Sequence, residues 1–132
     1  MDTAGRITVD QLLSEARRGL ERLEPRAAAA AISTGALLVD IRSDFERERD
    51  GLVPGALLVA RNVLEWRCDP ACPSCDERLA DLDSQLILMC DEGYQSSLAA
   101  ATLQRLGFQR ATDLAGGFQA WRDAGLPVSP PD

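Results

Sequence analysis

Histidine is absent from the whole chain of 132 residues. Its absence excludes the Cys-His and Ser-His-Asp nucleophile pairs and every metal site that needs an imidazole ligand. Any nucleophile in this protein must instead be activated by backbone dipoles or by another type of side chain.

The chain is also poor in positive charge and in long apolar segments. It carries 21 acidic against 14 basic side chains, a net charge of -7, which disfavours nucleic acid and anionic membranes as partners. No run reaches the roughly 18 apolar residues of a transmembrane helix, and residues 1–6 lack the features of a secretory signal. We therefore expect a cytoplasmic protein whose cysteines stay free, bind metal or act in catalysis.

Short apolar runs alternate with helix-like stretches along the chain. This alternation predicts one α/β domain over residues 1–128, with a central parallel sheet of about five strands and helices on both faces. Residues 129–132 are expected to form a disordered tail. The strands are expected at Ile7 and at 36–41, 56–60, 86–89 and 111–114. The helices are expected at 8–23, 25–32, 44–50, 62–66, 77–82, 96–107 and 118–123.

Cys90 follows the apolar run 86–89 and precedes a loop that leads into a helix. Loop N–H groups can point at its sulfur and stabilise a thiolate or a bound anion. This placement fits equally well a strand-end cysteine that only packs. In parallel α/β sheets the site lies at the carboxyl ends of the strands. The residues expected at that edge are Asp40, Arg42, Ala60, Cys90 and Ala115.

Four stretches, in order along the chain, have the form of known motifs. They are 37–42, which ends in Asp40-Ile41-Arg42; the turn 51–56; the loop Cys90–Ser96, with the length of a Cys-x-x-Gly-x-Arg-Ser loop; and 114–121 followed by 125–128. Together they resemble the rhodanese-like (sulfurtransferase) domain family, in register from about Ile7 to Val128. The resemblance implies a single rhodanese-like domain in which Cys90 carries sulfane sulfur as a persulfide and hands it to a thiol acceptor.

Two positions depart from the family pattern: Leu52 replaces a usual His, and Gln95 replaces the Arg of the sulfurtransferase loop. Gln95 offers amide hydrogen bonds in place of a bidentate cation. Asp91 and Glu92 place negative charge beside the nucleophile, which opposes the thiolate and repels thiosulfate. We therefore predict a sulfurtransferase that uses thiosulfate inefficiently and prefers a less anionic donor or a protein persulfide. The alternative is a catalytically weak or inactive binding or regulatory module.

Other residues near the loop support narrower predictions. Gly93 permits the backbone angles of a tight curl, and Tyr94 is expected to be exposed, where it could contact a donor or a partner. Ser96 or Ser97 is expected to cap the following helix. Arg42 is expected to pair with a carboxylate rather than to replace the missing cation. The related phosphatase loop, Cys-x5-Arg, is one residue longer and depends on its Arg, so phosphoryl transfer is not favoured.

Three further cysteines, Cys68, Cys72 and Cys75, have Cys-x3-Cys-x2-Cys spacing in a predicted loop. They could hold zinc if a fourth ligand completed the tetrahedron, or Cys72 and Cys75 could act as a redox pair. A surface loop with incidental thiols is the simplest alternative. The cluster is not part of the family pattern, so the resemblance says nothing about it. Apart from this candidate zinc site, we expect no cofactor.

Overall fold

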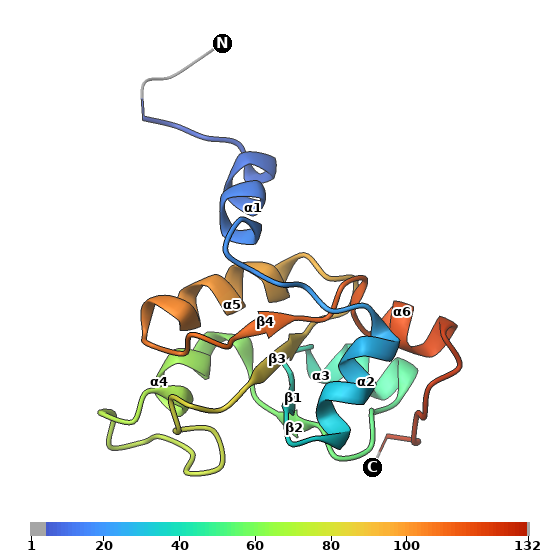
Figure 1. Ribbon diagram of the computed structural model, residues 1–132. Coiled ribbons are helices and arrows are strands. Elements are labelled where there is room, and N and C mark those ends of the chain that lie inside the picture. Colours follow the sequence, from blue (N-terminus) through green and yellow to red (C-terminus); the bar gives the residue numbers. More distant parts are fainter. Residues whose placement is uncertain (1–4, 132) are drawn as a thin grey trace.

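Four short parallel strands form the sheet at the centre of the computed structural model, which describes residues 5–131 (Figure 1). Their order is β2-β1-β3-β4. They are β1 (Leu37–Asp40), β2 (Leu57–Leu58), β3 (Leu86–Met89) and β4 (Thr112–Asp113). The predicted parallel α/β domain is therefore confirmed, with four strands where about five were expected.

The expected first strand at Ile7 is wrong. Ile7 lies outside any strand and is 44% exposed. Leu23 instead lies beside β4, in a parallel bridge to Leu114. Its N–H donates to the Asp113 carbonyl at 3.0 Å, and its own carbonyl accepts from Ala115 at 2.8 Å. Leu23 therefore occupies the position beside β4 where a fifth strand would pair.

Within residues 5–131, seven helical segments connect and cover the strands. They are α1 (Val9–Arg17), α2 (Pro25–Ser33), α3 (Asp44–Asp50), the 3-10 helix η1 (Arg61–Val63), α4 (Leu64–Cys68), α5 (Gln95–Arg105) and α6 (Gly117–Asp123). The capping box of Thr8 and Gln11 and the placement of Pro25 in a first turn are confirmed.

The predicted helix over 77–82 is wrong, because aspartate side chains close local turns there. Asp76 accepts a hydrogen bond from the Arg78 N–H at 2.9 Å, and Asp81 accepts one from the Asp83 N–H at 3.0 Å. Such side-chain bonds compete with helix formation. Leu79 still points into the core and is fully buried.

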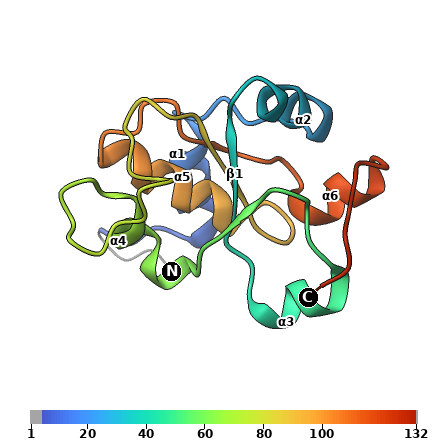
Figure 2. The same ribbon diagram turned by 90° about the horizontal axis from the view of Figure 1, so that it is seen from below.

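Alternate residues of β3 serve two separate hydrophobic cores. Leu86 and Leu88 pack towards α4 and α5, whereas Ile87 and Met89 pack towards α2 and α6. Figure 2 shows these helix pairs on opposite sides of β1. Helices on both faces are therefore confirmed, and a strand buried on both faces explains the unbroken apolar run of β3.

Helix α1 and the C-terminal segment both contact this body. Helix α1 packs against α5, on which it stands in Figure 1. Ser129, assigned from the sequence to the terminal tail, exchanges backbone hydrogen bonds of 2.9 and 2.7 Å with Leu52. The backbone pairing of the chain thus extends to Ser129, while Asp132 lies outside the described residues. No helix between residues 5 and 131 is both long and apolar enough to cross a membrane.

Candidate functional site

Cys90 lies directly after β3 and is 7% exposed. Its sulfur accepts hydrogen bonds from the N–H groups of Gly93 at 3.1 Å and Ser96 at 3.3 Å. In the thiol form the sulfur also donates to the Ser96 hydroxyl at 3.3 Å. The Cys90 loop (residues 90–95) thus forms a cradle of backbone donors that favours a sulfur anion.

Gly93 is required in the curl of this loop. Its φ of +90° is one that other L residues rarely adopt, and a Cβ there would lie 2.7 Å from the Gly116 nitrogen. Gly116 is the residue immediately before α6, so the Cys90 loop is packed tightly against the start of that helix. The prediction that Gly93 makes the curl is confirmed.

A buried carboxylate lies behind the cradle. Asp113, at the end of β4, is fully buried. One of its oxygens accepts hydrogen bonds from the hydroxyls of Ser96 at 2.7 Å and Ser97 at 2.8 Å. The serines are therefore not helix caps as predicted: α5 begins at Gln95, and both hydroxyls tie α5 to β4. Ser96 links the Cys90 sulfur to this carboxylate.

Two arginines from the N-terminal part of the chain hold the loop from behind. Arg22 binds Asp113 through Nε and Nη2, at 2.9 and 3.2 Å. Its Nη2 also donates to the Gly93 carbonyl at 2.9 Å, and Arg17 Nη2 donates to the same oxygen at 2.8 Å. Arg17 Nε donates further to the Ser97 hydroxyl at 3.0 Å. Sequence reasoning missed Arg17, Arg22 and Asp113, although a buried acid in the predicted strand 111–114 was a usable signal.

The acidic residues of the loop differ in their surroundings. The Asp91 carboxylate accepts from Gln119 Nε2 at 3.0 Å and from Arg49 at 3.4 Å, whereas Glu92 is exposed. Arg49 also pairs with Asp50 at 2.6 Å. The hydrogen bond from Arg49, aided by Gln119, holds the pKa of Asp50 below its ordinary value. The charge of Asp91 is therefore partly offset by Arg49, which sequence reasoning did not foresee.

Gln95 is exposed at the end of the loop, and its side chain is hydrogen-bonded to an arginine. Its side-chain oxygen accepts from Arg61 Nε at 3.1 Å, and Arg61 is in turn paired with Glu65 at 2.9 Å. Tyr94 is 62% exposed at the loop tip, as expected, with the Arg17 guanidinium 5.8 Å from its ring centroid. The mouth of the cradle therefore carries a neutral amide and an aromatic ring.

Arg42 forms the ion pair that the sequence predicted. Its Nη2 lies 2.9 Å from Asp40 Oδ2, and both side chains are fully buried. It also donates to the Gly51 carbonyl at 2.8 Å and stacks 3.9 Å above the Phe118 ring. Asp40 and Arg42 thus brace the carboxyl edge of the sheet beside the Cys90 loop, where Ile41 N–H binds the Met89 carbonyl at 2.9 Å.

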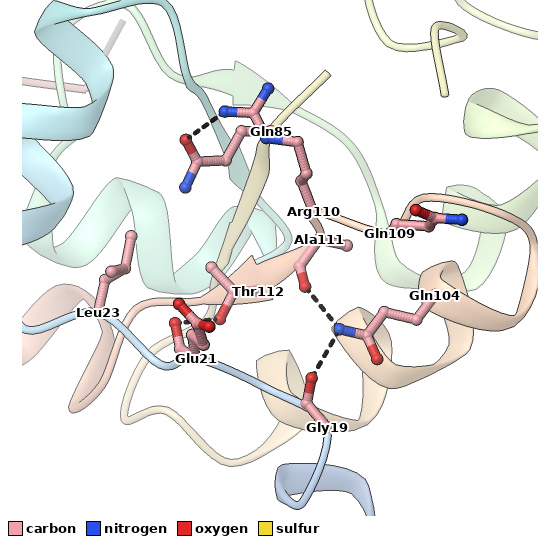
Figure 3. Close-up of a pocket in the computed structure, with 9 residues that line it drawn as sticks. All are labelled: Gly19, Glu21, Leu23, Gln85, Gln104, Gln109, Arg110, Ala111 and Thr112. Atoms are coloured by element: carbon pink, nitrogen blue, oxygen red, sulfur yellow. Dashed lines mark hydrogen bonds between the residues drawn. The ribbon is translucent and has the colours of Figure 1, made fainter. Parts of the chain in front are cut away.

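Two cavities lie at opposite edges of the sheet. The one at the carboxyl edge has a volume of about 490 Å³ and is lined by residues that follow β1 and β2, including Arg47, Ala60 and Arg61. The other, about 250 Å³, lies at the amino edge (Figure 3). There Gln104 donates to the carbonyls of Gly19 at 2.9 Å and Ala111 at 3.0 Å. Gln104 therefore anchors the segment after α1 at the amino edge, whereas Cys90 lies at the opposite, carboxyl edge.

The three other cysteines do not converge. Cys68 is fully buried at the end of α4, whereas Cys72 and Cys75 are partly exposed in the following loop. The Cys72 sulfur lies 3.2 Å from the Ser74 hydroxyl. Across residues 5–131, no three His, Cys, Asp or Glu side chains gather in a way that could hold a metal ion. The arrangement does not support the zinc site considered for this cluster.

A cysteine cradled at the carboxyl edge of a parallel sheet, beside a buried Asp-x-Arg pair, defines a rhodanese-type domain, and residues 24–124 match the Rhodanese-like domain model. The chain therefore belongs to the rhodanese-like family. It is 36% identical over 103 residues to thiosulfate sulfurtransferase GlpE of Pseudomonas fluorescens (strain SBW25), covering 77% of this chain and 84% of the relative.

Solved structures share this fold. RPA3614 of Rhodopseudomonas palustris CGA009, a protein of unknown function described as a possible tyrosine phosphatase, is 34% identical with a TM-score of 0.87, over 98% of this chain and 99% of that one. The polysulfide-sulfur transferase homodimer of Wolinella succinogenes has a TM-score of 0.75 at 22% identity, over 92% and 86% of the chains, and so shares the fold.

Proposed function

We propose that this protein is a sulfurtransferase that carries sulfane sulfur as a persulfide on Cys90. The observation that carries the proposal is the cradle itself: a buried sulfur with the N–H groups of Gly93 and Ser96 at 3.1 and 3.3 Å. Donors placed in this way stabilise a thiolate before the reaction and a persulfide anion after it. Membership of the family, and relatives named as thiosulfate sulfurtransferases, support the same chemistry.

The reaction consists of two displacements at sulfur. The Cys90 thiol first loses its proton to solvent. The thiolate then attacks the sulfane sulfur of the donor, a new S–S bond forms, and the donor's own S–S bond breaks with the electron pair leaving on the departing group. An acceptor thiolate next attacks the outer sulfur, and Cys90 leaves as a thiolate. No external oxidant or reductant is needed, because each step exchanges one bond to sulfur for another.

We further propose that thiosulfate is a slow donor. A sulfonate leaving group is best held by a fixed cation, and the loop presents Gln95 in that place. Asp91 and the exposed Glu92 add negative charge at the same mouth. Polysulfide, a low-molecular-weight persulfide or a protein persulfide would fit better, with a thiol as acceptor. Because such chemistry needs reduced thiols, we assign the protein to the cytoplasm.

The rate of persulfide formation with different donors tests the function. We expect glutathione persulfide and inorganic polysulfide to load Cys90 faster than thiosulfate does, and a Cys90→Ser variant to load with none of them. Faster loading by thiosulfate would contradict the donor preference. A folded protein that loads with no donor would favour the alternative, a binding or regulatory module that uses the same crevice.

A phosphatase activity is the second candidate, because the similar Rhodopseudomonas palustris protein is described as a possible tyrosine phosphatase. The loop argues against it: Gln95 is neutral, so a phosphoryl group would meet backbone donors without a loop guanidinium. We expect no hydrolysis of p-nitrophenyl phosphate above that of the Cys90→Ser variant. Hydrolysis that depends on Cys90 would assign the protein to phosphoryl transfer.

A further inference from the structure

The Cys90 loop is held by two residues that lie before the segment matched by the family model, residues 24–124. Arg17 ends α1, and Arg22 lies between α1 and α2. Both donate to the Gly93 carbonyl, at 2.8 and 2.9 Å. The peptide group that joins Gly93 to Tyr94 therefore has two guanidinium groups on its oxygen.

The geometry of the peptide group determines how the two arginines affect the N–H on its other side. No cis peptide bond occurs in the described chain, and in a trans peptide the C=O and the N–H point in opposite directions. The Tyr94 N–H therefore points away from the two arginines. Cations on a carbonyl oxygen polarise the amide and strengthen its N–H as a donor. The neighbouring peptide already donates its Gly93 N–H to the Cys90 sulfur at 3.1 Å.

The two arginines differ in how much of their charge is free. Arg22 is paired with the Asp113 carboxylate. Arg17 makes no ion pair with a carboxylate in residues 5–131. Its hydrogen-bond partners are the Gly93 carbonyl and the Ser97 hydroxyl, and its guanidinium lies 5.8 Å from the centroid of the Tyr94 ring. Arg17 therefore adds a net positive charge directly behind the loop.

We infer that Arg17 and Arg22 are positioning residues that set the reactivity of the Cys90 sulfur anion from behind the loop. Both orient the peptide between Gly93 and Tyr94, and Arg17 supplies net positive charge, which the neutral Gln95 does not. Because the Arg17 guanidinium is bound to the Gly93 carbonyl and the Ser97 hydroxyl, its charge acts on the Cys90 loop itself. The inference rests on the proposed function only in taking that sulfur as the reacting atom.

The test compares Arg17→Met with Arg18→Met, since Arg18 is the next residue, is exposed and forms no side-chain hydrogen bond or ion pair with the loop in the described chain. The rate of Cys90 alkylation by iodoacetamide, a neutral reagent, is measured against pH and at low ionic strength. The charged groups around the loop all contribute to this profile. They are Arg17 on α1, Arg22 before α2, Arg49 on α3 with Asp91, Arg61 on η1, the exposed Glu92 and Asp113 on β4.

We expect Arg17→Met to slow alkylation at neutral pH roughly threefold to tenfold and to move the profile to higher pH, as loss of a nearby cation requires. Arg18→Met should follow the wild-type curve. Added guanidinium ion at low millimolar concentration should restore part of the rate in an Arg17→Ala variant. A purely structural role for Arg17 would predict neither the pH shift nor this rescue.

Arg22 needs a milder substitution, because its loss would leave Asp113 buried and unpaired. Arg22→Lys keeps the charge but lacks the fork that reaches both partners, so we expect a smaller shift in the same direction. Superimposable wild-type and Arg17→Met curves would overturn the inference. If alkylation depends on Arg17 but no donor loads Cys90, the proposed function fails and the inference stands.

Discussion

Arg22 and Asp113, which are 91 residues apart in the chain, form a two-point ion pair with N–O distances of 2.9 and 3.2 Å. The carboxylate is fully buried, and the guanidinium side chain is 22% exposed. The same Arg22 Nη2 reaches the Gly93 carbonyl at 2.9 Å. One network therefore stabilises the fold and shapes the cradle around Cys90.

Replacing Asp113 should destabilise the protein strongly. In Asp113→Asn the Arg22 charge loses its buried partner, and we expect the free energy of unfolding to fall by roughly 3 kcal/mol. Chemical denaturation of wild type and variant measures this. Asp44→Asn is the matched control: Asp44 pairs with Arg47 at 3.0 Å but its side chain is fully exposed, so no measurable change is expected. Equal effects at the two positions would contradict the role of the buried network.

Gly93→Ala should damage both stability and reactivity. The alanine would have to adopt a φ of +90°, and its methyl group would lie 2.7 Å from the Gly116 nitrogen. We therefore expect the free energy of unfolding to fall by at least about 2 kcal/mol. Gly55→Ala shares a positive φ, +83°, but its Cβ would meet nothing within 4 Å. In that control the free energy of unfolding should fall by about 1 kcal/mol, and Cys90 should keep its wild-type reactivity. Denaturant unfolding and the alkylation rate of Cys90 separate the two.

Gln95→Arg should raise the rate with thiosulfate. A charge-assisted hydrogen bond to the sulfonate contributes about 1.5 kcal/mol, which corresponds to roughly a tenfold increase. The partner of Gln95 is Arg61, so Gln95→Met controls for simple loss of that 3.1 Å contact. Steady-state turnover with thiosulfate is the measurement. No gain in a folded Gln95→Arg variant would mean that the missing cation does not limit turnover.

Cys68 should be the least reactive thiol, and its ionisation should make the free energy of unfolding vary with pH in the alkaline range. Burial, with smaller contributions from Glu65 and Asp76, raises the pKa of the Cys68 thiol from 9.0 to about 12. Between these values the unfolded chain ionises at Cys68 and the folded protein does not. The stabilisation is therefore complete below pH 9.0 and is lost as pH rises towards about 12.

The difference in unfolding free energy between wild type and Cys68→Ala should accordingly narrow above pH 9.0. Parallel stability curves across that range would contradict the assignment. In the folded protein at mildly alkaline pH, alkylation followed by peptide mapping should label Cys72 and Cys75 but not Cys68, which is fully buried.

Local patterns predicted much of the fold and the position of Cys90 in the candidate site. The unbroken apolar run of β3 predicted a strand buried on both faces. Cys90 directly follows this run and therefore lies at the carboxyl edge of the parallel sheet. The pairing of Arg42 with Asp40 was also predictable, because the two residues are only two positions apart on a strand edge. In each case residues close in sequence determine the outcome.

The parts that were missed depend on contacts between distant segments. Arg17 meets Gly93 across 76 residues, and Arg22 meets Asp113 across 91. Ser96 and Ser97 have the composition of helix caps, yet a buried carboxylate on another strand takes their hydroxyls. Likewise, the edge of β4 was filled by Leu23 rather than by the expected strand at Ile7. Periodicity and capping rules contain no information on such pairings.

The mass of the intact protein after exposure to sulfane-sulfur donors tests the central claim most directly. The account predicts a gain of one sulfur atom that a reducing thiol removes, present in wild type and in Cys72→Ser and absent in Cys90→Ser. Peptide mapping should place the added sulfur on Cys90. Sulfur found only on Cys68, Cys72 or Cys75, or an unchanged gain in Cys90→Ser, would contradict it.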